Sequence, residues 1–384
     1  MKKICFITTV SLTMKAFVVE TAKYLHNKCG FDITLICNDD KEFSDSLPEC
    51  IRFIPVSMAR GVDLSVFSSI IDFIKIFKKE KFDLVQFSTP NASLAASVAA
   101  KICGVPIRLY CQWGIRYVGF SGVARKIFKL LEKIVCKNAT DVNAVSPINM
   151  EFAVKEGLYK DSKADVVGRG GTIGVDLSNY DISKKAEWRE IIRNKNGISK
   201  DDFVFGFSGR VSADKGCKEL FTAFKKVSEN NENVKLMIAG PIDDKSGSDD
   251  EIFNWAKNSD KVVFTGQIEN KEMCLHYAAM DVLVHPTYRE GFGMVIQEAG
   301  AMACPVITTD IPGASEVLEN GVSCLLVKPA DSESLYEKMN EICNDTQKVK
   351  EMGESARKFV EENYERSIML NNQLERYKKL LEDK

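Results

Sequence analysis

The chain has 384 residues, of which 45% are hydrophobic and 28% charged, and a formal net charge of -2 at pH 7. This composition is typical of a globular protein and excludes a disordered chain, and the near-neutral charge gives no overall signal for nucleic acid as a partner. Because domains usually hold about 100–200 residues, the length predicts two of them.

Short β-branched runs alternate with helical stretches through the first half of the chain. Apolar strands separated by helices predict a parallel sheet covered on both faces. The expected strands are 3–8, 32–37, 52–55, 84–87, 107–111, 141–145 and 164–167, and the expected helices lie around 14–28, 63–79, 92–102, 123–137 and 148–156.

The second half repeats this alternation, and two series of similar size predict an α/β fold with two Rossmann-like domains. The expected domains are 1–170 and 171–365, with a C-terminal helix in 366–384 that packs back toward the first domain. A glycine-rich segment at 168–185 predicts a hinge. The expected strands are 203–208, 235–239, 262–265, 282–285, 306–308 and 324–327, and the expected helices are 216–230, 251–257, 271–279, 294–303, 332–343, 348–363 and 366–381.

Cysteine and histidine usage favours a protein without a metal site. The 12 cysteines are scattered with no Cys-x-x-Cys pair, which predicts buried, reduced thiols. The histidines His26, His276 and His285 do not cluster. The first residues are typical of a β-strand rather than an export signal, and no apolar run approaches the roughly 20 residues that span a bilayer. We therefore expect a cytoplasmic protein that could rest on the inner face of a membrane.

Two glycines precede a predicted helix in the segment from Glu290 to Ala299. Free N–H groups in the first helical turn favour an anion, so a phosphate or a sugar oxygen is expected there. Glu298 falls in an otherwise small and apolar helix, where a carboxylate needs hydrogen-bond donors. The hydroxyls of a ribose would supply them, and so would a salt bridge to a lysine or arginine from another element.

An earlier loop, from Gly209 to Gly216, follows a predicted strand and carries two cations. Arg210 and Lys215 could converge on a diphosphate, or lie solvated on the surface. The loop is neither a Walker A motif nor a dinucleotide-binding Gly-x-Gly-x-x-Gly, which disfavours an ATPase and an NAD-dependent dehydrogenase.

A longer ordered set of motifs lies between about residues 203 and 345. Glu290 and Glu298 have a Glu-x7-Glu spacing, and the whole set resembles the GT4 family of retaining glycosyltransferases, in particular its capsular and O-antigen polysaccharide branch. The other matching pieces are Gly209-Arg210 with Lys215-Gly216, Ile238-Ala239-Gly240, Val263-Phe264-Thr265-Gly266, His285 to Gly293, Cys304 to Thr309, Pro312 to Val317 and Asn320-Gly321.

The first half of the chain matches the family more weakly. The glycine-rich segment from Gly168 to Asp176 is similar to the hinge-side segment of these enzymes. The glycine pair that many members carry near the first helix is absent. Gln112-Trp113-Gly114 stands where many members have a histidine before a glycine.

The resemblance implies a GT-B fold, in which two Rossmann-like domains face each other across a cleft. The first would bind the acceptor and the second the nucleotide-sugar donor. It implies Glu290, Arg210 and Lys215 as catalytic residues, with the cations on the donor diphosphate, Glu298 on the ribose and Glu290 on the transferred sugar. The implied donor-binding residues are Gly209, Arg210, Lys215, Gly266, Gln267, Ile268, Glu290, Gly291, Phe292, Gly293, Met294 and Glu298.

The implied function is metal-independent transfer of a sugar, with retained configuration, from a nucleotide diphosphate sugar, as a co-substrate rather than a cofactor. UDP is the expected nucleotide, and a saccharide or a polyprenyl-diphosphate-linked saccharide is the expected acceptor. The alternatives are a GT-B sugar-nucleotide 2-epimerase and a non-catalytic partner that binds nucleotide sugars.

A basic, amphipathic stretch covers residues 123–135. It is typical of a surface helix with one face in the core, and also of a patch that contacts anionic lipid.

Overall fold

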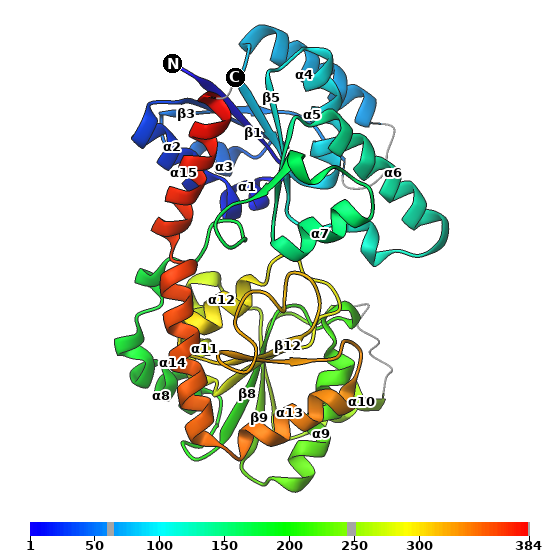
Figure 1. Cartoon of the computed structure of the whole chain (residues 1–384). Coiled ribbons are helices and arrows are strands. Elements are labelled where there is room, and N and C mark those ends of the chain that lie inside the picture. Colours follow the sequence, from blue (N-terminus) through cyan, green and yellow to red (C-terminus); the bar gives the residue numbers. More distant parts are fainter. Residues whose placement is uncertain (60–64, 244–250, 383–384) are drawn as a thin grey trace. The chain divides into compact units, whose positions relative to one another are not determined.

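The computed structural model describes residues 1–59, 65–243 and 251–382 (Figure 1). The chain divides into two compact units. The first comprises Met1–Ile173 and Ser367–Lys384, and the second Gly174–Arg366. Each unit holds one sheet with helices on both of its faces.

The sheet of the first unit has seven strands, all parallel, in the order β3-β2-β1-β4-β5-β6-β7. The strand order reverses between β1 and β4. The strands are β1 (Lys3–Ile7), β2 (Asp32–Cys37), β3 (Ile51–Pro55), β4 (Leu84–Phe87), β5 (Ile107–Gln112), β6 (Asp141–Ala144) and β7 (Ala164–Val166).

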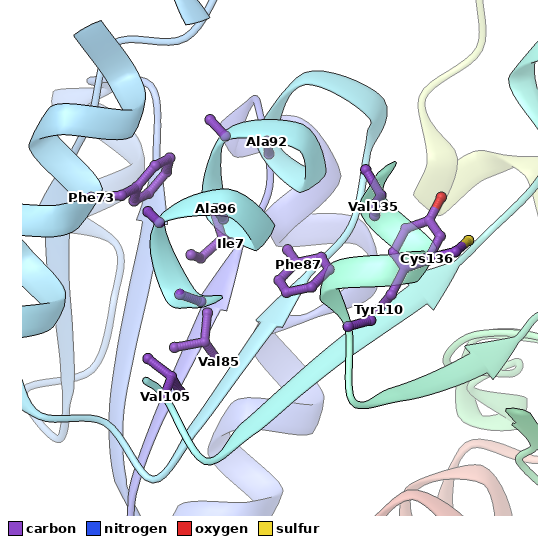
Figure 2. Packing of buried hydrophobic residues seen from close by; sticks show 14 of the residues in the cluster. Ile7, Phe73, Val85, Phe87, Ala92, Ala96, Val105, Tyr110, Val135 and Cys136 are labelled. Carbon is purple, nitrogen blue, oxygen red and sulfur yellow. The ribbon is translucent and has the colours of Figure 1, made fainter. Parts of the chain in front are cut away.

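Two apolar clusters cover the faces of this sheet. One packs α4 (Val66–Glu80), α5 (Pro90–Ile102), α6 (Gly122–Asn138) and α7 (Pro147–Lys155) against it. Figure 2 shows part of this cluster, with Phe87 and Tyr110 of the sheet beside Val135 of α6. The other face carries α1 (Ser11–Phe17), α2 (Val19–Cys29), α3 (Lys41–Asp45) and α15 (Arg366–Glu382).

The last helix completes the first unit. Tyr377 of α15 is buried, makes an edge contact with the ring of Phe6 at 5.8 Å, and donates a hydrogen bond from its hydroxyl to Gln86. Arg376 donates to the side chain of Asn143 at 2.9 Å. The C-terminal segment therefore belongs to the core of the N-terminal sheet, although the whole second unit separates them along the chain.

The sheet of the second unit has six parallel strands in the order β10-β9-β8-β11-β12-β13. The prediction of an α/β fold with two Rossmann-like parallel sheets is thus confirmed. The strands are β8 (Phe203–Ser208), β9 (Val234–Ala239), β10 (Val262–Gly266), β11 (Val282–His285), β12 (Val306–Thr309) and β13 (Cys324–Val327).

Helices cover both faces of this second sheet. One face carries α9 (Cys217–Asn230), α10 (Glu251–Asn258) and α13 (Ser332–Cys343). The others pack as pairs, α8 (Lys185–Lys195) with α11 (Met273–Ala279), and α12 (Met294–Ala301) with α14 (Thr346–Asn363).

Several helices differ from the sequence predictions. The helix expected over 14–28 is two helices, α1 and α2, separated at Val18, whose φ of -122° lies outside the α-helical range. Helices α3 and α8 were not predicted. The signal for α8 was present, because Trp188, Ile191 and Ile192 follow the spacing of a helical face. The expected start of the helix at 63–79 lies outside the described residues.

Candidate functional site

The candidate site lies at the carboxyl edge of the second sheet, where β8 and β11 are neighbours. The strand order reverses between these two strands, and in open parallel sheets such a reversal opens a crevice for ligands. The loop after β8 carries Arg210 and Lys215, and the loop after β11 carries Glu290. The topology thus brings the predicted cations and the predicted carboxylate to one crevice.

A glycine allows the backbones of these two loops to approach each other closely. Gly216 has a φ of +69°, and a Cβ there would lie 2.0 Å from the carbonyl oxygen of Pro286. Two hydrogen bonds cross the same junction, from Tyr288 N–H to the Asp214 carbonyl at 2.9 Å and from Thr287 Oγ1 to that carbonyl at 3.3 Å. The close backbone approach fixes Lys215 beside the β11 loop.

Glu290 is the centre of the contacts made at this junction. Its Oε2 lies 2.8 Å from Lys215 Nζ and 3.1 Å from His285 Nε2. Burial alone would raise the pKa of Glu290, but the hydrogen bond from His285 and the charge of Lys215 outweigh it and lower the pKa to about 2. Glu290 is therefore ionised at neutral pH and can only accept, so His285 Nε2 carries the donated proton.

Glu298 lies on α12 in a different environment. Its Oε2 accepts a hydrogen bond from the hydroxyl of Tyr277 at 2.9 Å, and Tyr180 also donates to it. Burial raises the pKa of Glu298 to about 7, and the two tyrosine bonds offset only part of that rise. Within the described residues no lysine or arginine forms an ion pair with Glu298, so tyrosine hydroxyls fill the place expected for a salt bridge.

Arg210 stands apart from the Lys215–Glu290 contact. Its side chain is 58% exposed and pairs with Asp243 at 3.0 Å. Arg210 and Lys215 nevertheless share a neighbour in Asp214. Burial raises the pKa of Asp214, but a hydrogen bond from Ser212 and the charges of Lys215, Arg210 and Arg289 lower it overall. The crevice therefore carries three cations, of which the sequence analysis named two.

The glycine turn before α12 is only partly available to a ligand. Gly293 N–H donates to the Gly313 carbonyl at 2.9 Å, and Gly291 N–H faces Glu290 Oε1 at 3.3 Å. Phe292 is buried against Tyr364, with ring centroids 5.7 Å apart. In this structure the N–H of Gly293 is therefore already engaged by a backbone carbonyl. Met294, the first residue of α12, is half-buried.

The remaining predicted residues line the same sheet edge. Gly209 N–H donates to the Ala239 carbonyl at 3.0 Å, and Gly240 N–H donates to the Gly266 carbonyl at 2.9 Å. Gly266 has a φ of +73°, with open space where a Cβ would project. Gln267 is exposed and Ile268 half-buried. This turn is therefore open to solvent.

Sequence reasoning missed the residues that support the two glutamates. His285 carried a signal, because a histidine at the end of an apolar strand faces the carboxyl edge. Tyr277 and Tyr180 carried none, since they meet Glu298 only through the packing of α11 and of the segment before α8. Among the described residues, no group of three or more His, Cys, Asp or Glu side chains could hold a metal ion, and no described helix is long and apolar enough to cross a bilayer.

Comparison with known proteins covers both units. The family model described as "Glycosyl transferases group 1" matches residues 189–359, and "Glycosyl transferase 4-like" matches residues 3–146. The chain is 30% identical over 371 residues to the capsular polysaccharide biosynthesis glycosyltransferase CapM of Staphylococcus aureus, covering 96% of this chain and 94% of that protein.

A second relative carries a more specific description. The chain is 26% identical over 328 residues to the UDP-Gal:alpha-D-GlcNAc-diphosphoundecaprenol alpha-1,3-galactosyltransferase of Escherichia coli, covering 82% of this chain and 81% of that protein. Among solved structures, HepE of Anabaena in complex with UDP and glucose superposes with a TM-score of 0.78 at 20% identity, covering 99% of this chain and 100% of that one. These likenesses extend over both units.

Proposed function

The chain belongs to the GT4 glycosyltransferases of surface-polysaccharide biosynthesis, with a GT-B fold, and from this premise we propose that it transfers a sugar from a UDP-sugar to a saccharide acceptor with retained configuration. The observation that carries the proposal is the contact of Lys215 with Glu290, 2.8 Å apart at the reversal of the strand order. It pairs a cation suited to a diphosphate with a carboxylate suited to a sugar.

The donor would lie along the crevice of the second unit. Lys215 and Arg210 would bind the diphosphate, the lysine leaving its contact with Glu290 as a phosphate oxygen arrives. Glu298 would accept hydrogen bonds from the ribose hydroxyls, beside Tyr277. Glu290 would accept from the hydroxyls of the transferred sugar, and the turn at Gly266 would face the base.

In the transfer step, the acceptor oxygen forms a bond to the anomeric carbon on the face that the diphosphate leaves. The bond from that carbon to the phosphate oxygen breaks, and its electron pair leaves with UDP. The acceptor proton passes to an oxygen of the departing phosphate. Arg210 and Lys215 stabilise the charge that grows on the diphosphate, which is the role that a metal ion would otherwise fill.

The nature of the donor and acceptor draws support from the relatives. The Escherichia coli relative is described with a UDP-galactose donor and a diphosphoundecaprenol-linked acceptor, and the Anabaena structure contains UDP. A polyprenyl-diphosphate-linked saccharide is therefore the acceptor we propose. The exposed cations of α6, which include Lys126 and Lys133, would bring the enzyme to an anionic membrane surface.

A panel of UDP- and GDP-sugars, assayed for released nucleoside diphosphate with and without a polyprenyl-diphosphate-linked saccharide, tests the proposal. We expect release from one UDP-sugar, faster with acceptor and slower in Arg210→Ala. Product of the opposite anomeric configuration would contradict retention. Interconversion of the sugar nucleotide without acceptor would favour the epimerase alternative, and binding without any turnover would favour the non-catalytic partner.

A further inference from the structure

An apolar groove of about 530 Å³ opens in the first unit, whereas the proposed donor crevice belongs to the second unit. Helix α5 forms its floor through Leu94 and Val98, while α4 contributes Phe67 and α6 contributes Phe128 and Leu131. Its volume falls within the range of small-molecule sites. The side chain of Phe67 is 63% exposed, so one wall of the groove is an apolar surface that the described residues leave uncovered.

The two ends of the groove differ in polarity, because polar residues gather at one end. Asn91 and Ser93 lie in the first turns of α5, which follows the carboxyl end of β4, and Arg116 follows the carboxyl end of β5. That end of the groove therefore lies at the carboxyl edge of the sheet, where α/β units bind ligands. From there the floor runs along α5 to Val98, where the lining is apolar.

Arg116 is placed to meet an anion at this end. Its guanidinium lies 4.7 Å from the ring centroid of Phe128 and 6.0 Å from that of Phe120. In the described parts of the chain it has no carboxylate partner. An arginine held over aromatic rings, with its fork of donors unused, matches the geometry of a phosphate or diphosphate.

Two further polar residues belong to the lining of the groove. The hydroxyl of Ser93 is fully buried and has no hydrogen-bond partner among the described residues. Ser93 exposes no surface, so its hydroxyl does not take part in binding a ligand in the groove. Glu132, the carboxyl group in the lining, is already engaged, because it accepts from Tyr110 at 2.8 Å and from Gln112 at 2.7 Å.

The outer surface of α6 adds positive charge beside the groove. Lys126, Lys133 and Lys137 are exposed and have no carboxylate partner in the described ranges. A ligand that suits this surface has an apolar chain that packs on the floor of the groove. It also has a diphosphate that binds Arg116 and whose negative charge complements the lysines of α6. An apolar peptide or a neutral lipid would leave the cations without a partner.

We propose that the groove over α5 holds the first isoprene units of a polyprenyl-diphosphate-linked acceptor, with the diphosphate on Arg116 at the carboxyl edge. This inference rests on the proposed function, since it assigns the lipid of the acceptor to a place in the first unit. The saccharide beyond the diphosphate then starts at the edge of the sheet rather than at the outer surface of the helices.

Farnesyl diphosphate is a suitable probe, titrated by calorimetry with saturating UDP present so that the proposed donor crevice is occupied. Inorganic diphosphate reports the head alone and farnesol the chain alone. We expect wild type to bind farnesyl diphosphate about tenfold or more tighter than either fragment. Equal affinity for inorganic diphosphate and farnesyl diphosphate would overturn the proposal.

Two tryptophan variants on one helix give a matched pair. Val98→Trp fills the floor of the groove, whereas Ile102 lies one turn further on α5, is 61% exposed and does not line the groove. Val98→Trp should weaken farnesyl diphosphate binding about tenfold or more and Ile102→Trp less than about twofold. Arg116→Gln should lower affinity for farnesyl diphosphate about tenfold and leave that for farnesol unchanged.

Two controls keep the outcomes separate. Titration of each protein with UDP measures nucleotide binding in the second unit. A wild type that does not bind UDP would count against the proposed function, while the farnesyl diphosphate titration still tests whether the groove binds the lipid. Binding to phosphatidylglycerol vesicles reports the bulk membrane. A loss of vesicle binding in Val98→Trp that equals its loss of farnesyl diphosphate binding would show that the groove only inserts into lipid, and would overturn the proposal.

Discussion

The two glutamates of the candidate site have opposite environments. Lys215 and His285 lower the pKa of Glu290, which is therefore ionised at neutral pH. Burial raises the pKa of Glu298 to about 7, although two tyrosine hydroxyls donate to it. Neighbouring carboxyl groups whose pKa values are pushed apart usually take different roles in a site. We expect Glu290 to act on the transferred sugar and Glu298 to respond to nucleotide binding.

UDP binding should depend on pH through Glu298. The carboxylate is the form that accepts from ribose hydroxyls, and with a pKa of about 7 it is mostly protonated at pH 6. Wild type should bind UDP about tenfold more weakly at pH 6 than at pH 8, beyond any change from the phosphate itself. Glu298→Gln, which retains only the titration of UDP, is the control. Parallel pH profiles for both proteins would contradict the assignment.

The same carboxyl group should cost stability at high pH. Its pKa is 4.5 when unperturbed and about 7 in the folded chain, so the folded state holds a proton that the unfolded state has released. Stability therefore falls as pH rises from about 4.5 to 7. Glu298→Gln should raise the free energy of unfolding at pH 8 by up to about 3 kcal/mol and change it little at pH 4. Urea unfolding at both pH values measures the difference.

Glu290→Gln should separate binding from turnover. Glu290 is proposed to contact the transferred sugar, which UDP lacks, so UDP affinity should stay within about twofold of wild type. The value of kcat should fall about tenfold or more, because the carboxylate acts as charge develops on the sugar. Calorimetry with UDP and initial rates with the preferred UDP-sugar give the two values. If Glu290→Gln loses UDP binding and Glu298→Gln keeps it, the two roles are reversed.

At the scale of elements, glycines decide how the loops of the second unit meet. Gly216 touches Pro286, Gly240 touches Gly209, and Gly313 touches Gly291, each so closely that a Cβ would lie within 2.3 Å of a carbonyl oxygen. The loop after β8 and the loop after β11 can therefore hold Lys215 and Glu290 together only while these positions lack side chains.

Gly216→Ala should destabilise the protein by about 2–4 kcal/mol, because it adds a backbone clash to an unfavourable φ. Gly197→Ala is the matched control, since Gly197 has a φ of +64° and open space around its Cβ position. It should cost only about 1 kcal/mol. Denaturant unfolding of both variants gives the comparison, and equal losses would show that the contact with Pro286 carries no weight.

At the scale of the whole molecule, the cations of the second unit would supply the positive charge that sugar transfer would otherwise take from a divalent metal ion. Arg210, Lys215 and Arg289 gather around Asp214 at the crevice, and together they supply positive charge where a diphosphate would leave. We expect transfer to proceed without a divalent ion.

Turnover of the preferred UDP-sugar should therefore remain within about twofold of its rate when EDTA is in excess, because the stabilisation of UDP rests on side chains. Initial rates with and without chelator measure this. Activity that disappears with EDTA and returns with magnesium or manganese would contradict the prediction.

The sequence alone determined the series of strands and most of the helices, because period and turn chemistry depend on residues near each other in the chain. It also determined that Glu298, in an apolar helix, needs hydrogen-bond donors. Helix α8 was not predicted although its signal was present, because most of its residues are charged or polar and its apolar periodicity is short.

Only the tertiary structure decided which residues meet. Lys215 and Glu290 are 75 positions apart, and they touch because β8 pairs with β11, although β9 and β10 lie between these two strands in the chain. Tyr277 reaches Glu298 through the packing of α11, and the groove over α5 exists because α4 and α6 stand on either side of it. Strand order and helix packing follow from contacts between distant segments, which local patterns do not encode.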